Sequence, residues 1–181
     1  AQVPVNDDFD SHFDRFQRTA FRYESLPAYA VAQEADLIDA WRRGLPRAER
    51  SVRTSPWLRR IAVTTAAGKE WTRVRVVDDP LPEYLRYELP ALIESQAAGD
   101  QTFMVARADS VPDPDFWLFD AGTPEAAALL MRYNDEGEFE VGIYWQSIPG
   151  TMGEDFAFCE LYRKHGGRVF LDHSISVLHE G

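Results

Sequence analysis

Hydrophobic side chains recur every three or four residues in four stretches of the chain, and this spacing predicts helices. The first helix is expected over residues 7–22, where the apolar positions are Phe9, Phe13, Phe16, Ala20 and Tyr23. The next two are expected over residues 34–43 and 55–68. The fourth begins near Leu85 and contains Pro90, which we expect to break or kink it.

Patterns that alternate with a period of two predict strands between and after these helices. In residues 71–77, Val74 and Val76 fall on one face and Arg73 and Arg75 on the other, so this strand has one polar face. Further strands are expected at residues 101–106, 116–119, 129–133 and 139–145. The last two flank four turn-forming residues and therefore predict a hairpin.

Together these elements predict a mixed α/β fold of the α+β type, with a mostly antiparallel central sheet and flanking helices. One domain is expected over residues 7–145, and a small C-terminal α/β appendage over residues 151–181. Hydrophobic residues make up 45% of the 181 residues, which is enough to bury a core and argues against a disordered chain.

The composition also narrows the compartment and the class of site. No apolar run approaches the roughly 20 residues of a membrane helix, so no membrane partner is expected. The first residues, Ala1-Gln2-Val3-Pro4, lack the basic and apolar regions of a signal peptide, and we expect a cytoplasmic protein. The single cysteine, Cys159, excludes an internal disulfide framework and a cysteine-based zinc site.

The net charge of −11 repels a phosphate backbone, so nucleic acid is not the expected partner. Residues 42–60 are the exception, with seven arginines against Glu49 alone. Guanidinium groups bind anions bidentately, which makes this stretch a candidate contact for an anionic protein partner or, as a weaker alternative, for DNA. The competing interpretation is a solvated loop whose arginines pair with the surplus carboxylates of the chain. The candidate contact residues are Arg50, Arg53, Arg59 and Arg60.

A second group of chemical interest lies near the C-terminus and combines carboxylates with imidazoles: Glu154, Asp155, Asp172, His173 and His179. Such groups can hold a transition metal, and a carboxylate can act as a general base. The alternative is that the two acids stabilise the start of a helix and that the histidines are surface residues. Spacing alone favours the alternative.

A third group lies where the strand of residues 71–77 ends. Asp78 and Asp79 follow this strand, and Glu83 and Glu88 are near in sequence. Carboxylates at the carboxyl end of a strand often carry chemistry in α/β enzymes. Because Asp79 precedes a proline, a simple turn is the stronger interpretation.

Several segments of the first three-quarters of the chain occur in the order and spacing of one known family: Phe13-Asp14-Arg15-Phe16, Arg73-Val74-Arg75-Val76-Val77-Asp78-Asp79-Pro80, Tyr84-Leu85-Arg86-Tyr87-Glu88, Asp115-Phe116-Trp117-Leu118-Phe119-Asp120 and Leu130-Met131-Arg132-Tyr133-Asn134-Asp135-Glu136-Gly137. On these segments, residues 8 to about 136 resemble a family of uncharacterised actinomycete domains. The family is similar to small accessory proteins encoded beside helix-turn-helix regulators. The resemblance implies a regulatory context and no established chemistry.

The end of the chain carries a different resemblance, on Gly153-Glu154-Asp155-Phe156-Ala157-Phe158-Cys159, Gly167-Arg168-Val169-Phe170-Leu171-Asp172-His173-Ser174 and Leu178-His179. With these motifs, residues 138–181 resemble the C-terminal end of a family 2 glycosyltransferase domain of the GT-A type. The resemblance implies Asp155 as the catalytic base beside Glu154, His179 as a ligand of Mn²⁺ or Mg²⁺ with His173 near it, and a nucleotide-sugar donor. The preceding residues lack the Asp-x-Asp donor site of such enzymes, so a join is expected near residues 134–140. A natural fusion, an engineered chimera and a generated sequence all fit this join.

The sequence therefore supports two functions. The first is a non-catalytic cytoplasmic accessory or sensor protein that acts through a protein partner near a transcription regulator, with no cofactor expected. The alternative is a metal-dependent glycosyltransferase-like enzyme, with Asp155 as base.

Overall fold

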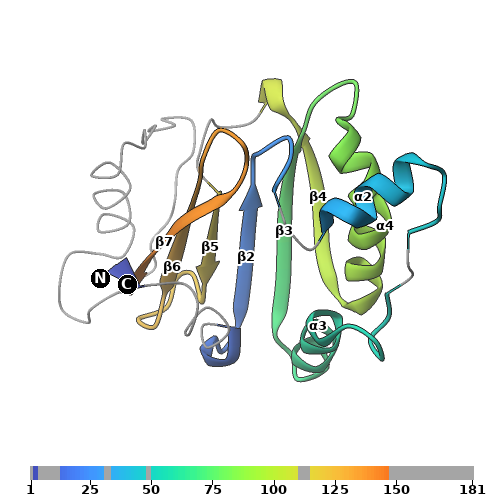
Figure 1. Cartoon of the computed structure of the whole chain (residues 1–181). Coiled ribbons are helices and arrows are strands. Elements are labelled where there is room, and N and C mark those ends of the chain that lie inside the picture. Colours follow the sequence, from blue (N-terminus) through green and yellow to red (C-terminus); the bar gives the residue numbers. More distant parts are fainter. Residues whose placement is uncertain (1, 4–12, 31–33, 48–49, 110–114, 147–181) are drawn as a thin grey trace.

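A mixed sheet of seven strands organises the protein, in the order β1-β7-β6-β5-β2-β3-β4 (Figure 1). The computed structural model describes residues 2–3, 13–30, 34–47, 50–109 and 115–146. The pairs β2–β3 and β3–β4 are parallel, and the other four pairs are antiparallel. The strands are β1 (Gln2–Val3), β2 (Thr19–Glu24), β3 (Glu70–Val77), β4 (Asp100–Ala106), β5 (Asp115–Phe119), β6 (Ala127–Tyr133) and β7 (Phe139–Gln146).

This topology confirms the predicted mixed α/β fold with a mostly antiparallel sheet. The strands expected from alternation at residues 71–77, 101–106 and 116–119 are β3, β4 and β5, and the expected hairpin is β6–β7. The appendage predicted over residues 151–181 lies outside the described residues.

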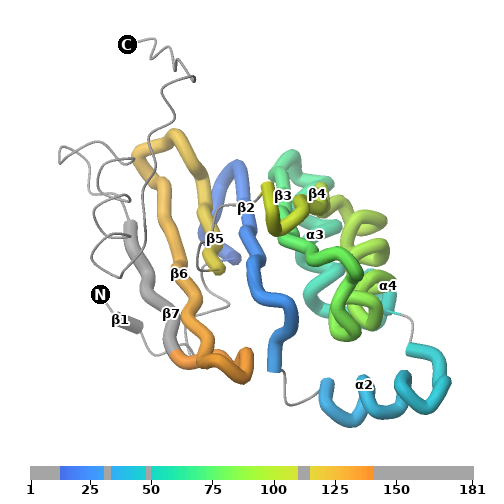
Figure 2. The backbone as a smooth tube through the Cα atoms, turned by 90° about the horizontal axis from the view of Figure 1, so that it is seen from above, coloured from blue at the N-terminus to red at the C-terminus, as the bar shows by residue number. Residues whose placement is uncertain are grey.

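Three helices gather beside β3 and β4, at one end of the sheet (Figures 1 and 2). They are α2 (Ala35–Arg42), α3 (Pro56–Ala66) and α4 (Glu83–Ala98); a short 3-10 turn, η2 (Arg107–Asp109), follows β4. Helix α3 begins as its sequence predicts, because Ser55 Oγ accepts a hydrogen bond from the amide of Leu58 at 3.3 Å and Pro56 occupies the first helical position.

The hydrophobic core lies between α3 and one face of the sheet. Tryptophan and phenylalanine rings fill it and meet mostly edge to face, for example Phe13 on Trp117 at 4.8 Å and Trp57 on Trp71 at 5.4 Å between ring centres. The buried members of this core are Phe13, Phe16, Ala20, Leu58, Ile61, Trp71, Ala98, Trp117, Phe119, Ala127, Leu129 and Met131.

The helix predicted over residues 7–22 is wrong from residue 16 onward. Residues 13–15 are helical, whereas Thr19–Glu24 is strand β2, and residues 7–12 lie outside the described residues. The residues of β2 alternate: Ala20 shares a face with Arg22 and Glu24, while the aromatic side chains between them lie on the other face. Phe16 and Ala20 both enter the core, but from a turn and a strand, so their spacing mimics a helical stripe.

Of the two effects expected of Pro90, a break or a kink, the break is wrong, because α4 runs without interruption from Glu83 to Ala98. Pro90 lies on the exposed side of the helix. Leu85 and Tyr87 before it and Leu92 after it are buried, and their packing holds both halves of the helix in one element. Tertiary packing here outweighs the local cost of a missing amide hydrogen bond.

The β6–β7 hairpin is tied to the segment that follows β2, which we call the strap (Ser25–Ala30). The amide of Ala30 donates to the carbonyl of Gly137 at 2.8 Å. Gly137 has a φ of +81°, and a Cβ there would stand 2.8 Å from the carbonyl oxygen of Ala28. The contact therefore requires glycine for two reasons, its left-handed backbone and the closeness of the strap.

We predict that Gly137→Ala destabilises the protein by about 2–4 kcal/mol, since the strap backbone must move in addition to the cost of about 1–2 kcal/mol for a left-handed alanine. Gly122→Ala is the matched control, because Gly122 has a φ of +76° and nothing within 4 Å of an added Cβ. Urea unfolding of both variants measures the difference. Equal losses of unfolding free energy in the two variants would contradict a close contact between the strap and Gly137.

Candidate functional site

The face of the sheet that carries the core changes from apolar to charged along β2 and β3. Ala20 and Trp71 pair in register at the apolar end, followed by Arg22 opposite Arg73. The third pair on this face, Glu24 opposite Arg75, is also charged. Because every second residue of a strand points to the same side, the charged pairs continue the face on which the core is built.

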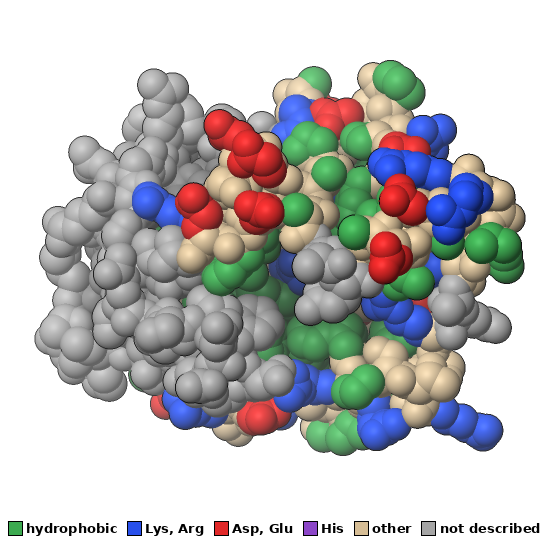
Figure 3. Space-filling view, in the orientation of Figure 1, with side chains coloured by type: hydrophobic (Ala, Val, Ile, Leu, Met, Phe, Trp, Pro, Cys, Tyr) green, Lys and Arg blue, Asp and Glu red, His purple; other side chains and the backbone are tan. Residues whose placement is uncertain are grey.

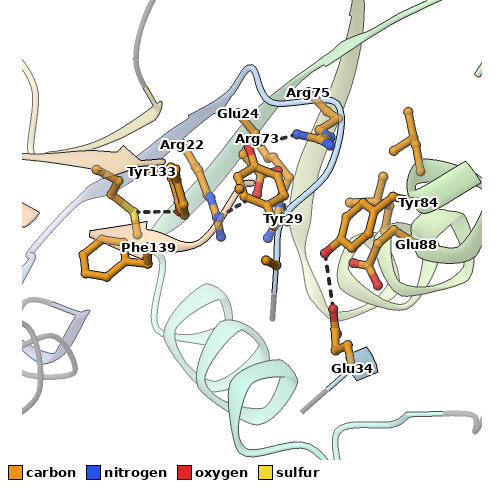
Figure 4. A pocket seen from close by; sticks show the side chains of 15 residues that line it. Arg22, Glu24, Tyr29, Glu34, Arg73, Arg75, Tyr84, Glu88, Tyr133 and Phe139 are labelled. Atoms are coloured by element: carbon orange, nitrogen blue, oxygen red, sulfur yellow. Dashed lines mark hydrogen bonds and ion pairs between the residues drawn. The ribbon is translucent and has the colours of Figure 1, made fainter. Parts of the chain in front are cut away.

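A cavity of about 300 Å³ lies over these charged pairs (Figure 4). Its floor is formed by β2 and β3, one wall by α4, and the opposite wall by the β6–β7 hairpin. The strap and the start of α2 complete the lining. The charged and aromatic side chains of the lining are Arg22, Glu24, Tyr29, Glu34, Arg73, Arg75, Tyr84, Glu88, Tyr133 and Phe139.

Glu24 is the centre of a buried ion network on the floor. The residue is 5% exposed, and its two carboxylate oxygens lie 2.7 Å from Arg22 Nη2 and 3.4 Å from Arg73 Nη1. Arg73 Nε also lies 3.1 Å from Asp100 Oδ2, an oxygen that accepts a hydrogen bond from the Ser95 hydroxyl at 2.8 Å. Burial alone would raise the pKa of Glu24, but the nearby guanidinium groups together lower it below its ordinary value.

Arg75 differs from its two neighbours because it has no carboxylate partner. The residue is 3% exposed, and none of the described carboxylates lies within 4 Å of its guanidinium. Its Nη1 donates to the hydroxyl of Tyr29 at 2.9 Å, and the guanidinium lies 4.9 Å from the centre of the Tyr29 ring. Arg75 lines the cavity, and its other guanidinium nitrogens donate to none of the described residues.

Tyr29 and Asp115 hold the strap over the floor. The Tyr29 hydroxyl donates to Asp115 Oδ2, and Ser25 donates to Asp115 Oδ1 from its amide at 2.7 Å and from its hydroxyl at 2.9 Å. Burial raises the pKa of Tyr29, and the charges of Glu24 and Asp115 raise it further. Burial also raises the pKa of Asp115, although the hydrogen bonds from Tyr29 and Ser25 oppose the rise. Tyr29 therefore stays a neutral hydroxyl that both donates and accepts.

The α4 wall carries a carboxyl group with unused hydrogen-bonding capacity. Glu88 Oε1 is buried and accepts no hydrogen bond from the described residues, and Arg47 Nη2 stands 3.9 Å from it. Beside it, the hydroxyl of Tyr84 donates to Glu34 Oε2 at 3.2 Å (Figure 4). Burial raises the pKa of Glu88, the charge of Glu34 adds to this rise, and Arg47 opposes it.

The four arginines singled out in the sequence do not form one site. Arg50 Nη2 lies 3.4 Å from Glu34 at the rim of the cavity, and Arg60 pairs with Asp14 at 3.4 Å. Arg59 donates to the carbonyl oxygens of Val52 and Arg53, so only Arg53 and Arg59 come together. In the space-filling view, arginines and carboxylates lie intermixed over the half of the molecule that carries the helices (Figure 3).

The other candidates fall elsewhere. Glu154, Asp155, His173 and His179 lie outside the described residues, and the described part of the chain contains no group of three or more metal-ligating side chains. Asp78 binds Arg107 Nε at 2.5 Å, and this hydrogen bond lowers the pKa of Asp78. None of the described helices is long and apolar enough to cross a membrane.

The sequence does not single out the cavity residues, because a polar strand face can lie toward solvent or beneath helices. The alternation of Arg73 and Arg75 with valines predicts a polar face, but it does not say which face the helices cover. The same alternation in Thr19–Glu24, with Arg22 and Glu24 on one side, was the signal that could have paired the two strands.

Fold and site together define a mixed α/β domain with an ion-lined cavity between its sheet, one helix and a hairpin. The chain belongs to the family described as "Domain of unknown function (DUF6879)", whose model matches residues 7–146. No match was found among curated proteins or among solved structures.

We predict that Glu88→Gln stabilises the protein by on the order of 1 kcal/mol at about pH 8 and leaves its stability unchanged near pH 4. A carboxyl whose pKa is raised by folding favours the folded state while it is protonated. This stabilisation is lost as the pH rises through the folded-state pKa, and glutamine mimics the protonated form. Thermal unfolding across this pH range measures the effect.

Glu125→Gln is the control for this series, because Glu125 is exposed on the β5–β6 connection. A Glu88→Gln variant that is less stable than the wild type at about pH 8 would contradict the assignment of a desolvated carboxyl.

Proposed function

We propose that this chain is a non-catalytic sensor domain that binds a small polar molecule in the cavity and reports its presence to a protein partner. The observation that carries the proposal is the buried guanidinium of Arg75, which lines the cavity without a carboxylate partner among the described residues, together with the carboxyl groups of Glu34 and Glu88 in the same lining. Buried polar groups without partners are costly, so a ligand that completes them would bind favourably.

The chemistry of the lining suits binding more than proton transfer. The three guanidinium groups stay charged at any pH a cell reaches. Burial raises the pKa of Tyr84 and raises that of Tyr133 to about 12, so their hydroxyls keep their protons near neutral pH. These arginines and tyrosines give a ligand a surface of constant charge, whereas Glu88, whose pKa is raised, is a lining group whose charge changes with pH.

Glu34 offers a route from the cavity to the surface. It lines the cavity, and it also pairs with Arg50, one of the arginines that the sequence indicates as partner contacts. A ligand that engages Glu34 would weaken its hold on Arg50 and so alter the exposed arginine loop. The resemblance of the chain to actinomycete domains encoded beside helix-turn-helix regulators supports a transcription regulator in the cytoplasm as the partner.

The glycosyltransferase-like alternative, with Asp155 as base and His179 as ligand of Mn²⁺ or Mg²⁺, stays a prediction. Its residues lie outside the described part of the chain, and none of the contacts described above favours it.

We predict that at least one compound in a library of small polar metabolites raises the midpoint of thermal unfolding of this protein saturably, by several degrees at 100 times its dissociation constant. Arg75→Gln should abolish this shift. Arg86→Gln, the same change at an exposed position of α4, should keep it. Charge reversal at Arg50 should weaken the complex with the regulator in a pull-down, and it should change ligand affinity without abolishing binding, because Arg50 and the ligand share Glu34.

A library that gives no saturable shift would contradict the proposed function. A shift that Arg75→Gln leaves unchanged would place the binding site outside this cavity.

A further inference from the structure

The cavity lining presents a guanidinium on its β3 side and carboxyl groups on its α2 and α4 sides, and these groups have opposite chemistry. Arg75 presents guanidinium donors on the β3 floor, without a carboxylate partner among the described residues. A planar fork of this kind matches a carboxylate, which accepts two parallel hydrogen bonds. The neighbouring Arg22 and Arg73 are already paired with Glu24, so Arg75 is the arginine of the lining without a carboxylate counter-ion among the described residues.

The α4 side of the cavity presents acceptors. Glu88 and Glu34 both line the cavity, and Glu34 lies close enough to Glu88 to raise its pKa. An ammonium group carries three donors and a positive charge. Placed in the cavity beside Glu88 and Glu34, it would offset the repulsion between the two carboxylates.

The charge of the lining selects against ligands that carry one sign only. The lining holds three arginines and three glutamates, so it is formally neutral. A polyanion such as a nucleoside diphosphate would bring its charge against Glu34 and Glu88. A simple cation would leave Arg75 unpaired. A ligand with one group of each sign satisfies both walls.

Aromatic rings form the space between the two charged ends. Tyr29 meets Tyr84 and Tyr133 edge to face, with ring centres 6.0 Å and 5.1 Å apart, and Tyr133 meets Phe139 at 5.6 Å (Figure 4). Ring faces attract an ammonium group and also accept apolar atoms. The volume of about 300 Å³ is at the small end for ligand cavities and fits a molecule of amino-acid size.

We infer that the ligand of this cavity is a free amino acid, whose carboxylate binds Arg75 and whose ammonium group binds Glu88. This inference rests on the proposed function and names the ligand class of the same site. Binding of this ligand is non-covalent.

The test is isothermal titration calorimetry of the full chain with the twenty common free amino acids. For each one that binds, two derivatives are titrated: the carboxamide, which lacks the carboxylate, and the N-acetyl derivative, which lacks the ammonium group. We expect at least one free amino acid to bind saturably and both of its derivatives to bind at least tenfold more weakly.

The variants assign each end of the ligand to its residue. Arg75→Gln should weaken binding of the free amino acid at least tenfold, and the carboxamide should then bind no worse than the parent. Glu88→Gln should also weaken binding of the free amino acid at least tenfold, and the N-acetyl derivative should then bind this variant no worse than the parent amino acid does. Arg86→Gln is the control and should bind as the wild type does. Circular dichroism confirms that each variant is folded.

Two results would overturn the inference. If no free amino acid binds while phosphorylated or purely anionic metabolites do, the ligand class is wrong and the sensor function stands. If a derivative binds as tightly as its parent, the zwitterion requirement is wrong. Failure of every small molecule tested would remove the proposed function as well.

Discussion

The buried carboxylate of Glu24, held between Arg22 and Arg73, is the interaction on which the charged half of the sheet depends. Two arginines on neighbouring parallel strands point to the same side and would repel each other without an anion between them. Replacing one partner of a buried ion pair leaves an uncompensated charge and commonly costs about 3–5 kcal/mol. The network therefore keeps this part of the sheet face polar, where apolar side chains could otherwise have extended the core.

The same sheet face serves two purposes because its two ends are built differently. At one end, aromatic rings around Trp71 and Trp117 bury a dense core under α3. At the other end, guanidinium and carboxyl groups line a cavity under the strap. Arg22 joins the two regions, since its guanidinium lies 4.9 Å from the Trp117 ring centre while it binds Glu24. A rigid core beside the cavity gives the ligand groups fixed positions, as a preorganised site requires.

Local patterns in the sequence predict those elements whose signals agree with each other. Helix α3 has a serine cap, a proline at its first position and buried residues at helical spacing, and strands β3 to β7 alternate or form short apolar runs. Residues 16–22 show where this fails, because Phe16 and Ala20 reach one core from different elements. The cavity depends on contacts such as Arg73 with Glu24, which are 49 residues apart, and no local pattern reports such a pairing.

A double-mutant cycle on Glu24 and Arg73 measures the interaction energy of this pair most directly, with unfolding free energies determined in urea at neutral pH. We predict that Glu24→Gln and Arg73→Gln each cost about 3–5 kcal/mol and that the double variant costs at least about 1 kcal/mol less than their sum. Because folding lowers the pKa of Glu24, the loss in Glu24→Gln should shrink as the pH falls below about 4. Additive losses, or a Glu24→Gln variant as stable as the wild type, would contradict the claim that this carboxylate holds the charged half of the sheet together.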